Sequence, residues 1–413
     1  METLSHLITY SLLFLTIYFE VFLLVTYFED KEHFALTKAK PRMPGKYPSA
    51  TIIIPAWNEG ETIRGTVESL LALDYPKDRL KIFIVDDGSS DETLAIARQY
   101  DAHPQISVFS KQNGGKYSAL NLGITHAKTD LVGCLDADSF VEKSALKEII
   151  PYFDDLFVMA VTPSVQIHKP DNVLRRMQST EYMIGEFTRK VFSRLNALYV
   201  TPGPFSIYRR SVFAKIGGFV HGFSTEDMEM AMRMQNNHMK IENAHTAFVF
   251  TIPPKTVRSL YKQRVRWVTG FLKNAIFSYP HMFLSRKHGN LGMLTLPFAF
   301  ISIFIALFFV ALYAKSLFAY AHGLYLKYAA LGLHFGMPTL DWFSINFEFQ
   351  RLLIYLLFFT TIFFILMGVR MVKNSIVISR DLFYFLACYG FIAPLWLARS
   401  VYNLVTAKEA GWR

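Results

Sequence analysis

The chain has little of what stabilises small secreted proteins or builds structural zinc sites. Only two of its 413 residues are cysteines, Cys134 and Cys388. Two cysteines so far apart in sequence provide neither a disulfide framework nor a zinc site, and we interpret both as packing residues. Internal repeats and low-complexity linkers are also missing. No G-x-G-x-x-G pattern follows the first predicted strand, which makes a nicotinamide-dependent enzyme an unfavourable interpretation.

Charged residues are scarce as well, at 18% of the chain, whereas 52% of the residues are hydrophobic and 38 are phenylalanine. The mean hydropathy of +0.24 is too high for an ordinary soluble enzyme and indicates a membrane protein. The formal net charge of +10 fits cytoplasmic basic flanks, attraction to anionic lipid and an anionic substrate. The charge does not choose among these three.

Long apolar runs occur at both ends of the chain. A spanning helix needs about 20 such residues. We predict spans at His6–Phe28, Leu291–Ala314, Leu352–Val369 and a shorter one at Leu382–Ala398, broken by Gly390 and Pro394. The run Ser316–His334 contains Lys327 and several glycines and is left open as a loop, an interfacial helix or a further span.

Basic residues set the expected orientation of these spans. Those between Lys31 and Lys46 follow the first span, which places this end in the cytoplasm, the N-terminus outside, and the first span as a retained anchor. Arg286, Lys287, Arg370, Lys373 and Arg380 place later flanks inside as well. Four spans would leave the C-terminus outside, which conflicts with a cytoplasmic tail at Lys408–Arg413. Within the first span, Glu20 is either a pathway residue or a helix-packing partner.

From Ser49 onward, short apolar strands alternate with amphipathic helices. Such alternation predicts an α/β, Rossmann-like fold with a mostly parallel sheet, whose ligands bind beyond the carboxyl ends of the strands. The predicted strands are Thr51–Ile54, Lys81–Val85, Ile106–Phe109, Leu131–Leu135 and Val158–Thr162. The predicted helices are Glu61–Leu73, Asp91–Gln99, Lys116–Ala127 and Lys143–Phe153.

The fourth strand ends in two carboxylates one residue apart, Asp136 and Asp138. Side chains two apart on an extended chain point to the same side, so both carboxylates can face one small volume. Mg²⁺ commonly binds one or two carboxylates together with substrate phosphates. We therefore interpret the pair as a metal–diphosphate site, and a solvated turn after a strand is the alternative.

Polar clusters also follow the first two strands. Pro55, Trp57 and Glu59 belong to the first, and Asp87 belongs to the segment Asp86-Asp87-Gly88-Ser89-Ser90 after the second. In this order and spacing the clusters resemble family 2 glycosyltransferases of the GT-A fold, over residues 49–271. The resemblance implies that these four residues and Lys116 hold the uridine diphosphate of a sugar nucleotide. The alternative for the aspartate segment is a turn in which Ser89 or Ser90 caps the next helix.

Two later motifs strengthen the resemblance. Thr225-Glu226-Asp227 opens a helical run, and in the resembling family a carboxylate at Asp227 acts as general base, with Glu226 beside it. An ordinary capped helix start is the alternative. Gln263-Arg264-Val265-Arg266-Trp267 is similar to the Q-x-x-R-W motif of processive members. That similarity implies that Arg266 approaches the diphosphate, Trp267 supports the acceptor sugar, and Gln263 and Arg264 belong to the same site; the alternative is a basic helix lying on the membrane.

Between these motifs, the segment around Gly203 and Pro204 ends in Tyr208-Arg209-Arg210. It resembles the acceptor segment of chitin, hyaluronan and poly-N-acetylglucosamine synthases, except that Phe205 stands where some relatives have a smaller residue. The run Asn172–Leu195 is interpreted as a solvated or membrane-facing helix without chemistry.

Together these features predict five segments: an N-terminal transmembrane helix (1–30), a basic linker (31–48), a cytoplasmic GT-A domain (49–250), interfacial amphipathic helices (251–290) and C-terminal transmembrane helices (291–413). We expect an inverting, processive enzyme of the plasma membrane that polymerises a UDP-sugar, with UDP-N-acetylglucosamine favoured, on Mg²⁺ or Mn²⁺ held by Asp138 and Asp136. Its expected partners are a UDP-sugar, a growing glycan and the bilayer, and not nucleic acid; the oligomeric state is left open. Single-sugar transfer to a lipid carrier, a hyaluronan or cellulose synthase, and a transporter or inactive scaffold are the alternatives.

Overall fold

The computed structural model describes residues 2–29, 47–332 and 348–406. Most of the predicted basic linker and the tail from Lys408 lie outside these residues. The chain divides into two compact units, one of residues 1–25 and 298–364 and the other of residues 26–297 and 365–413. Each unit is described by itself.

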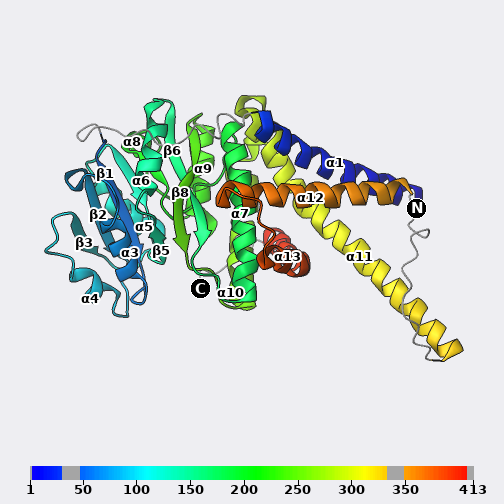
Figure 1. Cartoon of the computed structure of the whole chain (residues 1–413). Helices are drawn as coiled ribbons and strands as arrows, with labels where there is room; N and C mark the ends of the chain where they lie inside the picture. Colours follow the sequence, from blue (N-terminus) through cyan, green and yellow to red (C-terminus); the bar gives the residue numbers. More distant parts are fainter. Residues whose placement is uncertain (1, 30–46, 333–347, 407–413) are drawn as a thin grey trace. The chain divides into compact units, whose positions relative to one another are not determined.

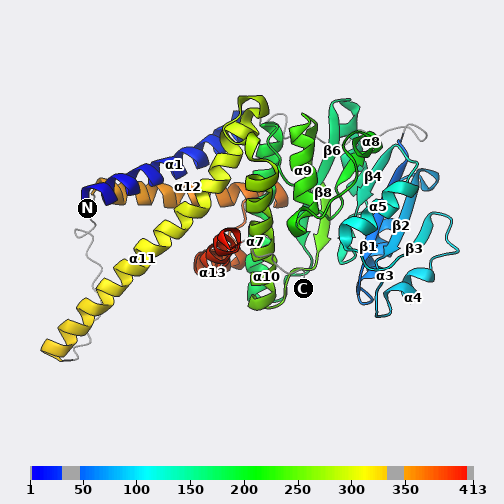
Figure 2. The same ribbon diagram turned by 180° about the vertical axis from the view of Figure 1, so that it is seen from behind.

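The larger unit is built on one eight-stranded sheet with the order β3-β2-β1-β4-β7-β6-β8-β5. Helices cover both faces of this sheet (Figures 1 and 2). The strands are β1 Ala50–Ala56, β2 Leu80–Asp86, β3 Ile106–Ser110, β4 Leu131–Cys134, β5 Ser139–Val141, β6 Val158–Ile167, β7 Ile207–Arg209 and β8 Lys240–Thr251.

One half of the sheet, from β3 to β4, is parallel throughout. In β1, Ile52 pairs with Ile82 of β2 on one side and with Gly133 of β4 on the other. Every residue of β1 is buried, because helices lie on both faces, and its run of β-branched isoleucines suits such a strand. The five predicted strands are all present, and this half confirms the predicted α/β arrangement.

The other half of the sheet was not predicted beyond β6. Here β7 pairs antiparallel with both β4 and β6, and β5 pairs antiparallel with β8. Strand β8 carries buried polar residues that bond within the protein: the Ser193 hydroxyl donates to Glu242 Oε2 at 2.6 Å, and the Asn243 amide donates to Thr162 Oγ1 at 3.2 Å. Because of these polar residues, the hydrophobic pattern did not predict the strand. The antiparallel pairings of β5 and β7 make the sheet mixed and not simply parallel.

The helices agree with most of the predicted ranges. They are α1 Glu2–Glu29, α3 Ile63–Leu71, α4 Thr93–Arg98, α5 Lys116–His126, α6 Ala145–Ile149, α7 Val173–Arg194, α8 Arg210–Ile216, α9 Glu226–Asn236, α10 Val257–Lys273, α11 Leu296–Leu331, α12 Phe349–Lys373 and α13 Arg380–Val405. The serine cap considered for the helix after Asp91 is wrong. Helix α4 begins at Thr93 without a side-chain cap, and Ser89 and Ser90 instead bond to Asn58 in the turn after β1.

The interpretation of α7 as a solvated or membrane-facing surface is wrong. This helix packs on β6 and β8, and a majority of its residues are buried. Its charged side chains are paired inside the protein: Lys190 Nζ donates to the Asn243 carbonyl at 2.8 Å, and Arg189 is 2.6 Å from Glu186. The prediction failed because a buried helix tolerates charged residues when they are paired. Composition alone does not reveal the pairing, so these charges were assigned to a solvent-facing surface.

Four helices are long and apolar enough to cross a membrane, at His6–Glu29, Leu291–Ala330, Phe349–Lys373 and Arg380–Val405. The open segment from Ser316 continues α11 as far as Leu331, so its described part is helical and not a loop. Helix α13 also runs without interruption through Gly390 and Pro394, contrary to the expected break. In the smaller unit, the Thr361 hydroxyl donates to Glu20 Oε1 at 2.8 Å, which makes Glu20 a helix-packing partner.

Candidate active site

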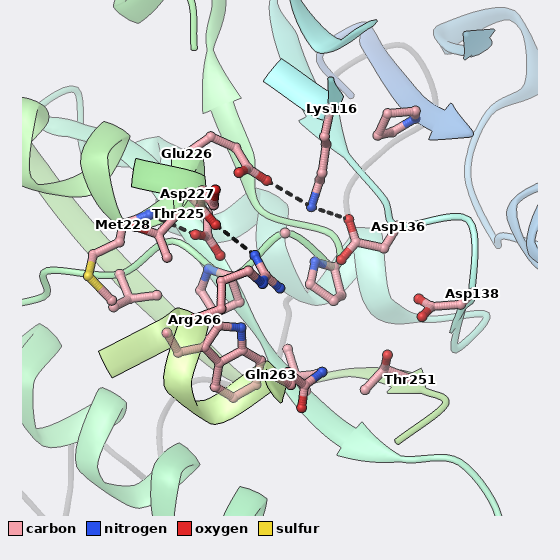
Figure 3. Close-up of a pocket in the computed structure, with 18 of the residues that line it drawn as sticks. Lys116, Asp136, Asp138, Thr225, Glu226, Asp227, Met228, Thr251, Gln263 and Arg266 are labelled. Atoms are coloured by element: carbon pink, nitrogen blue, oxygen red, sulfur yellow. Dashed lines mark hydrogen bonds and ion pairs between the residues drawn. The ribbon is translucent and has the colours of Figure 1, made fainter. Parts of the chain in front are cut away.

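A cavity of about 1510 Å³ opens beyond the carboxyl ends of β1, β2 and β4. Its walls contain every site residue predicted from the sequence except Arg264 (Figure 3). The lining includes Pro55, Trp57, Glu59, Asp87, Lys116, Asp136, Asp138, Gly203, Pro204, Glu226, Asp227, Gln263, Arg266 and Trp267. The residues span more than two hundred positions of sequence and meet in one space.

On one side of the cavity, Asp87 organises a loop. Its carboxylate accepts hydrogen bonds from Lys111 Nζ at 2.7 Å, from the Gly114 N–H at 3.1 Å and from the Gly115 N–H at 2.8 Å. Gly114 and Gly115 line the cavity themselves. Sequence reasoning missed Lys111, although it stands five residues before Lys116 and directly after the third strand, where such side chains gather.

Lys116 lies at the centre of the cavity. Its Nζ is 2.6 Å from Asp136 Oδ1 and 3.2 Å from Glu226 Oε1 (Figure 3). Burial lowers the pKa of Lys116, but the charges of Asp136, Glu226 and Asp227 outweigh this and raise the pKa well above its ordinary value. The Lys116 ammonium therefore bridges the carboxylates of Asp136, in the turn after β4, and Glu226 of α9.

Gly203 stands directly over this ion pair. A Cβ at that position would lie 2.6 Å from Lys116 Nζ and 2.9 Å from both Asp136 oxygens. Any larger residue there would therefore displace the Lys116 or Asp136 side chain and disturb the ion pair. The predicted turn at Gly203 and Pro204 is thus packed against the centre of the site.

Asp138 lies beyond Asp136, on the side away from Asp227 (Figure 3). Burial, followed by the negative charges of Asp136 and Glu59, raises the pKa of Asp138 to about 7. The neighbouring Ser139 hydroxyl donates to Asp138 Oδ1 at 3.1 Å. Among the described residues, no three His, Cys, Asp or Glu side chains converge as a complete metal site. A divalent cation would fit here if phosphate oxygens completed its ligands, because it would relieve the crowding of like charges.

The first turn of α9 presents two acids, Glu226 and Asp227, whose pKa values are shifted in opposite directions. Burial, and then the charge of Glu226, raises the pKa of Asp227 to about 6. For Glu226 burial acts in the same direction, but attraction to Lys116 outweighs it and lowers the pKa. Asp227 is therefore the group of the pair that is suited to exchange a proton near neutral pH.

Helix capping does not explain this acidic turn. Thr225 is the N-cap residue but makes no side-chain cap bond; its hydroxyl donates to the Gly222 carbonyl at 2.8 Å. The backbone is held from elsewhere, since the Thr201 hydroxyl donates to the Asp227 carbonyl at 2.8 Å. Helix α10 also approaches so closely that a Cβ on Gly270 would meet Thr225 side-chain atoms at 2.4 Å.

The Q-R-V-R-W motif lies on α10 and divides into two groups. Gln263, Arg266 and Trp267 line the cavity, and Arg266 donates to the Ser224 carbonyl at 2.7 Å, next to the acidic turn. Arg264 does not line the cavity. Its guanidinium donates to both oxygens of Glu181, at 3.0 and 2.7 Å, and lies 4.2 Å from the centroid of the Trp267 ring. Arg264 therefore supports the tryptophan from behind.

Helix α7 supplies a wall of the cavity that the sequence reasoning missed. Glu181, Gly185, Thr188 and Phe192 line the cavity, together with Tyr182 and Arg189. The first four recur at intervals of three and four residues and so form one helical stripe. That periodicity was the available signal, and it was obscured by the many basic residues of this segment.

Comparisons with known proteins agree with this geometry. Residues 51–217 match the family model described as Glycosyl transferase family 2. The chain is 31% identical over 274 residues to poly-beta-1,6-N-acetyl-D-glucosamine synthase of Staphylococcus aureus, covering 65% of this chain and 66% of that protein. It is 31% identical over 224 residues to the enzyme of the same name from Staphylococcus epidermidis, covering 53% and 54%. Both alignments span less than two thirds of the relatives' own lengths.

Among solved structures, the chain is similar to a mannosyltransferase from Pyrobaculum calidifontis, solved in complex with GDP-Man and Mn²⁺. The TM-score is 0.62 at 16% sequence identity, with coverage of 97% of this chain and 100% of that one. At this identity the likeness shows a shared fold, which is the GT-A fold joined to long apolar helices.

The fold is of the GT-A class, in a chain with four helices that are long and apolar enough to cross a membrane. Residues 51–217 belong to glycosyltransferase family 2, as the resemblance of the sequence motifs implied.

Proposed function

We propose that this protein is an inverting polysaccharide synthase of the plasma membrane, which transfers sugars from a UDP-sugar to a growing β-linked glycan on the cytoplasmic side. The observation that carries the proposal is the meeting of Asp138, Asp227 and Trp267 in one cavity. A donor site, a base and a flat aromatic platform are the three parts that sugar transfer needs.

The donor would lie on the side of β1, β2 and β4. Trp57 and Glu59 line the end of the cavity where the uracil ring would bind, and Asp87 holds the loop that bounds this end. Asp138 and Asp136 would hold Mg²⁺ or Mn²⁺, which supplies positive charge for the diphosphate when bound. Lys116 and Arg266 add fixed positive charge where the leaving diphosphate gains negative charge.

The acceptor would lie on the side of α10, with a sugar ring against Trp267. Asp227 takes the proton of the acceptor hydroxyl as its oxygen forms a bond to the anomeric carbon. The bond from that carbon to the diphosphate oxygen breaks on the opposite face, and UDP leaves with the electron pair. Attack and departure on opposite faces invert the anomeric centre.

UDP-N-acetylglucosamine is the favoured donor. Support comes from the identity to two synthases named for poly-beta-1,6-N-acetyl-D-glucosamine and from the acceptor segment around Gly203 and Pro204. Processive transfer is supported by the Q-x-x-R-W motif and by a cavity larger than the roughly 300–1,000 Å³ typical of small-ligand sites. Export of the polymer through the membrane helices belongs to the same proposal.

The decisive experiment measures UDP release from the purified full chain against a panel of UDP-sugars, followed by sizing and linkage analysis of the product. We expect release with UDP-N-acetylglucosamine and a polymer of β-linked N-acetylglucosamine. A single added sugar on a lipid would establish the non-processive alternative, and a different preferred donor would favour a hyaluronan or cellulose synthase. Absence of UDP release with every donor would contradict the proposal, provided that the protein is folded by circular dichroism.

A further inference from the structure

Helix α13 is the last of the four helices that are long and apolar enough to span a membrane. Unlike an isolated span, it packs across α7 and α10 of the catalytic unit (Figures 1 and 2). The contacts run along nearly its whole length. Its buried positions are Leu382, Ala393, Trp396, Ser400 and Asn403, which recur at helical spacing and form one face.

Specific polar contacts fix both ends of this face to the catalytic unit. Near the start of α13, Asp381 is 3.6 Å from Arg176 of α7. Near its end, the Ser400 hydroxyl donates to the Val265 carbonyl of α10 at 3.3 Å, and the Asn403 amide lies 3.5 Å from Thr269 Oγ1.

These contacts are incompatible with a membrane crossing. Asp381 and Asn403 are 22 helical steps apart, or about 33 Å, which is enough to cross the roughly 30 Å hydrocarbon thickness. If α13 crossed the bilayer, Arg176 and Thr269 would lie on opposite sides of it. Both belong to one folded domain whose helices carry charged residues along their length, including Arg189 and Arg266, so neither α7 nor α10 can occupy hydrocarbon.

The opposite face of α13 carries large apolar side chains that are mostly exposed. Phe383 is 69% exposed, Phe391 71%, Leu395 58% and Val405 79%. A stripe of this kind is characteristic of a helix lying in the boundary between headgroups and acyl chains. The six residues between Lys373 and Arg380 extend to at most about 20 Å, which keeps the start of α13 close to the membrane end of α12.

We infer that α13 lies on the membrane surface as an interfacial helix, with Phe383, Phe391 and Leu395 in the lipid boundary and its inner face on the catalytic domain. The protein then has three spans, α1, α11 and α12. The C-terminus then lies on the same side of the membrane as the catalytic domain. Three spans therefore resolve the conflict between four predicted spans and a cytoplasmic tail. This inference depends on helix packing and not on the proposed polymerase activity.

The first experiment places single cysteines in the full-length protein with Cys388 replaced by alanine, and labels sealed membrane vesicles of known orientation with a maleimide that does not cross bilayers. Thr406→Cys tests the end of α13, and the exposed Lys128→Cys marks the catalytic side. We expect both to be labelled from the same side. Labelling of Thr406→Cys from the side opposite to Lys128→Cys would overturn the inference.

The second experiment measures depth. A fluorophore attached at Phe383→Cys, Phe391→Cys or Leu395→Cys is quenched by lipids that carry a spin label at a shallow or a deep position. An interfacial helix gives the same preference for the shallow quencher at all three sites. A spanning helix would show deep quenching at positions 391 and 395 only, and a helix in water would show none; either result would contradict the inference.

Discussion

The two sides of the cavity are built in different ways. The proposed donor side rests on the parallel half of the sheet, where polar turns follow the regular strands β1, β2 and β4. The acceptor side is assembled from α7, α9 and α10 and from the antiparallel strand β7, which are distant in sequence. The donor side is fixed by local rules of strand and turn, whereas the acceptor side depends on long-range packing.

This difference predicts separable effects of mutation. Substitutions on the acceptor side should impair transfer and leave binding of the UDP moiety intact. Lys116 is the exception, because its ammonium contacts acids of both sides. Variants that change transfer but not UDP binding, or the reverse, would support this distinction. Variants that change both would contradict it.

The largest effect is expected for Asp227→Asn. The amide keeps the shape of the side chain but cannot take a proton, so transfer should fall by about 100- to 10,000-fold, the range for loss of a general base. Binding of UDP, measured by calorimetry, should be unchanged. Asp101→Asn, at an exposed position outside the cavity, serves as the control. Wild-type transfer in Asp227→Asn would remove the base assignment.

An intermediate effect is expected from pH. Because the pKa of Asp227 is raised to about 6, the base is ionised above this value and protonated below it. Transfer at saturating donor should therefore be present above pH 6 and fall as the pH decreases, to about one tenth at pH 5. Donor binding, followed separately, should lose strength nearer pH 7, where Asp138 takes up a proton. Coincident pH profiles for binding and transfer would show that the two sides do not titrate independently.

The smallest effect is expected for Arg264→Lys. Lysine keeps the charge but loses the fork that grips both oxygens of Glu181 and the flat guanidinium that packs on Trp267. Transfer should fall about tenfold or less through a raised KM for the acceptor glycan, with the Kd for UDP unchanged. Arg258→Lys, on an exposed part of the same helix, is the matched control. A change in UDP affinity would show instead that Arg264 belongs to the donor side.

On the proposed donor side, the pattern of apolar strands placed the polar turns, although Lys111 was missed and the roles of the other residues came from the resemblance. Asp136 and Asp138 could be placed in the site from the strand that precedes them and the alternation of its side chains. The acceptor side was accessible only through resemblance. The helical spacing of Glu181 with Gly185, Thr188 and Phe192 was the one signal in α7, and it does not tell which surface the helix packs on.

Strand β8 and helix α13 show two further reasons for failure. In β8, the buried Glu242 and Asn243 form hydrogen bonds with Ser193 and Thr162, and a hydropathy pattern does not reveal such partners. In α13, composition alone does not distinguish a face that touches lipid from one that touches protein. Both cases need knowledge of the partner surface.

The hydrogen bonds of Asp87 have a consequence for how the enzyme meets its donor. The carboxylate accepts hydrogen bonds from Lys111 and from the two glycine N–H groups, so the protein's own contacts hold this loop in shape. Ordering a mobile glycine loop on binding would cost conformational entropy and would weaken the affinity for the proposed donor. The proposed polymerase would bind a new donor for every sugar that it adds, and a loop held by the protein's own contacts would spare this cost each time.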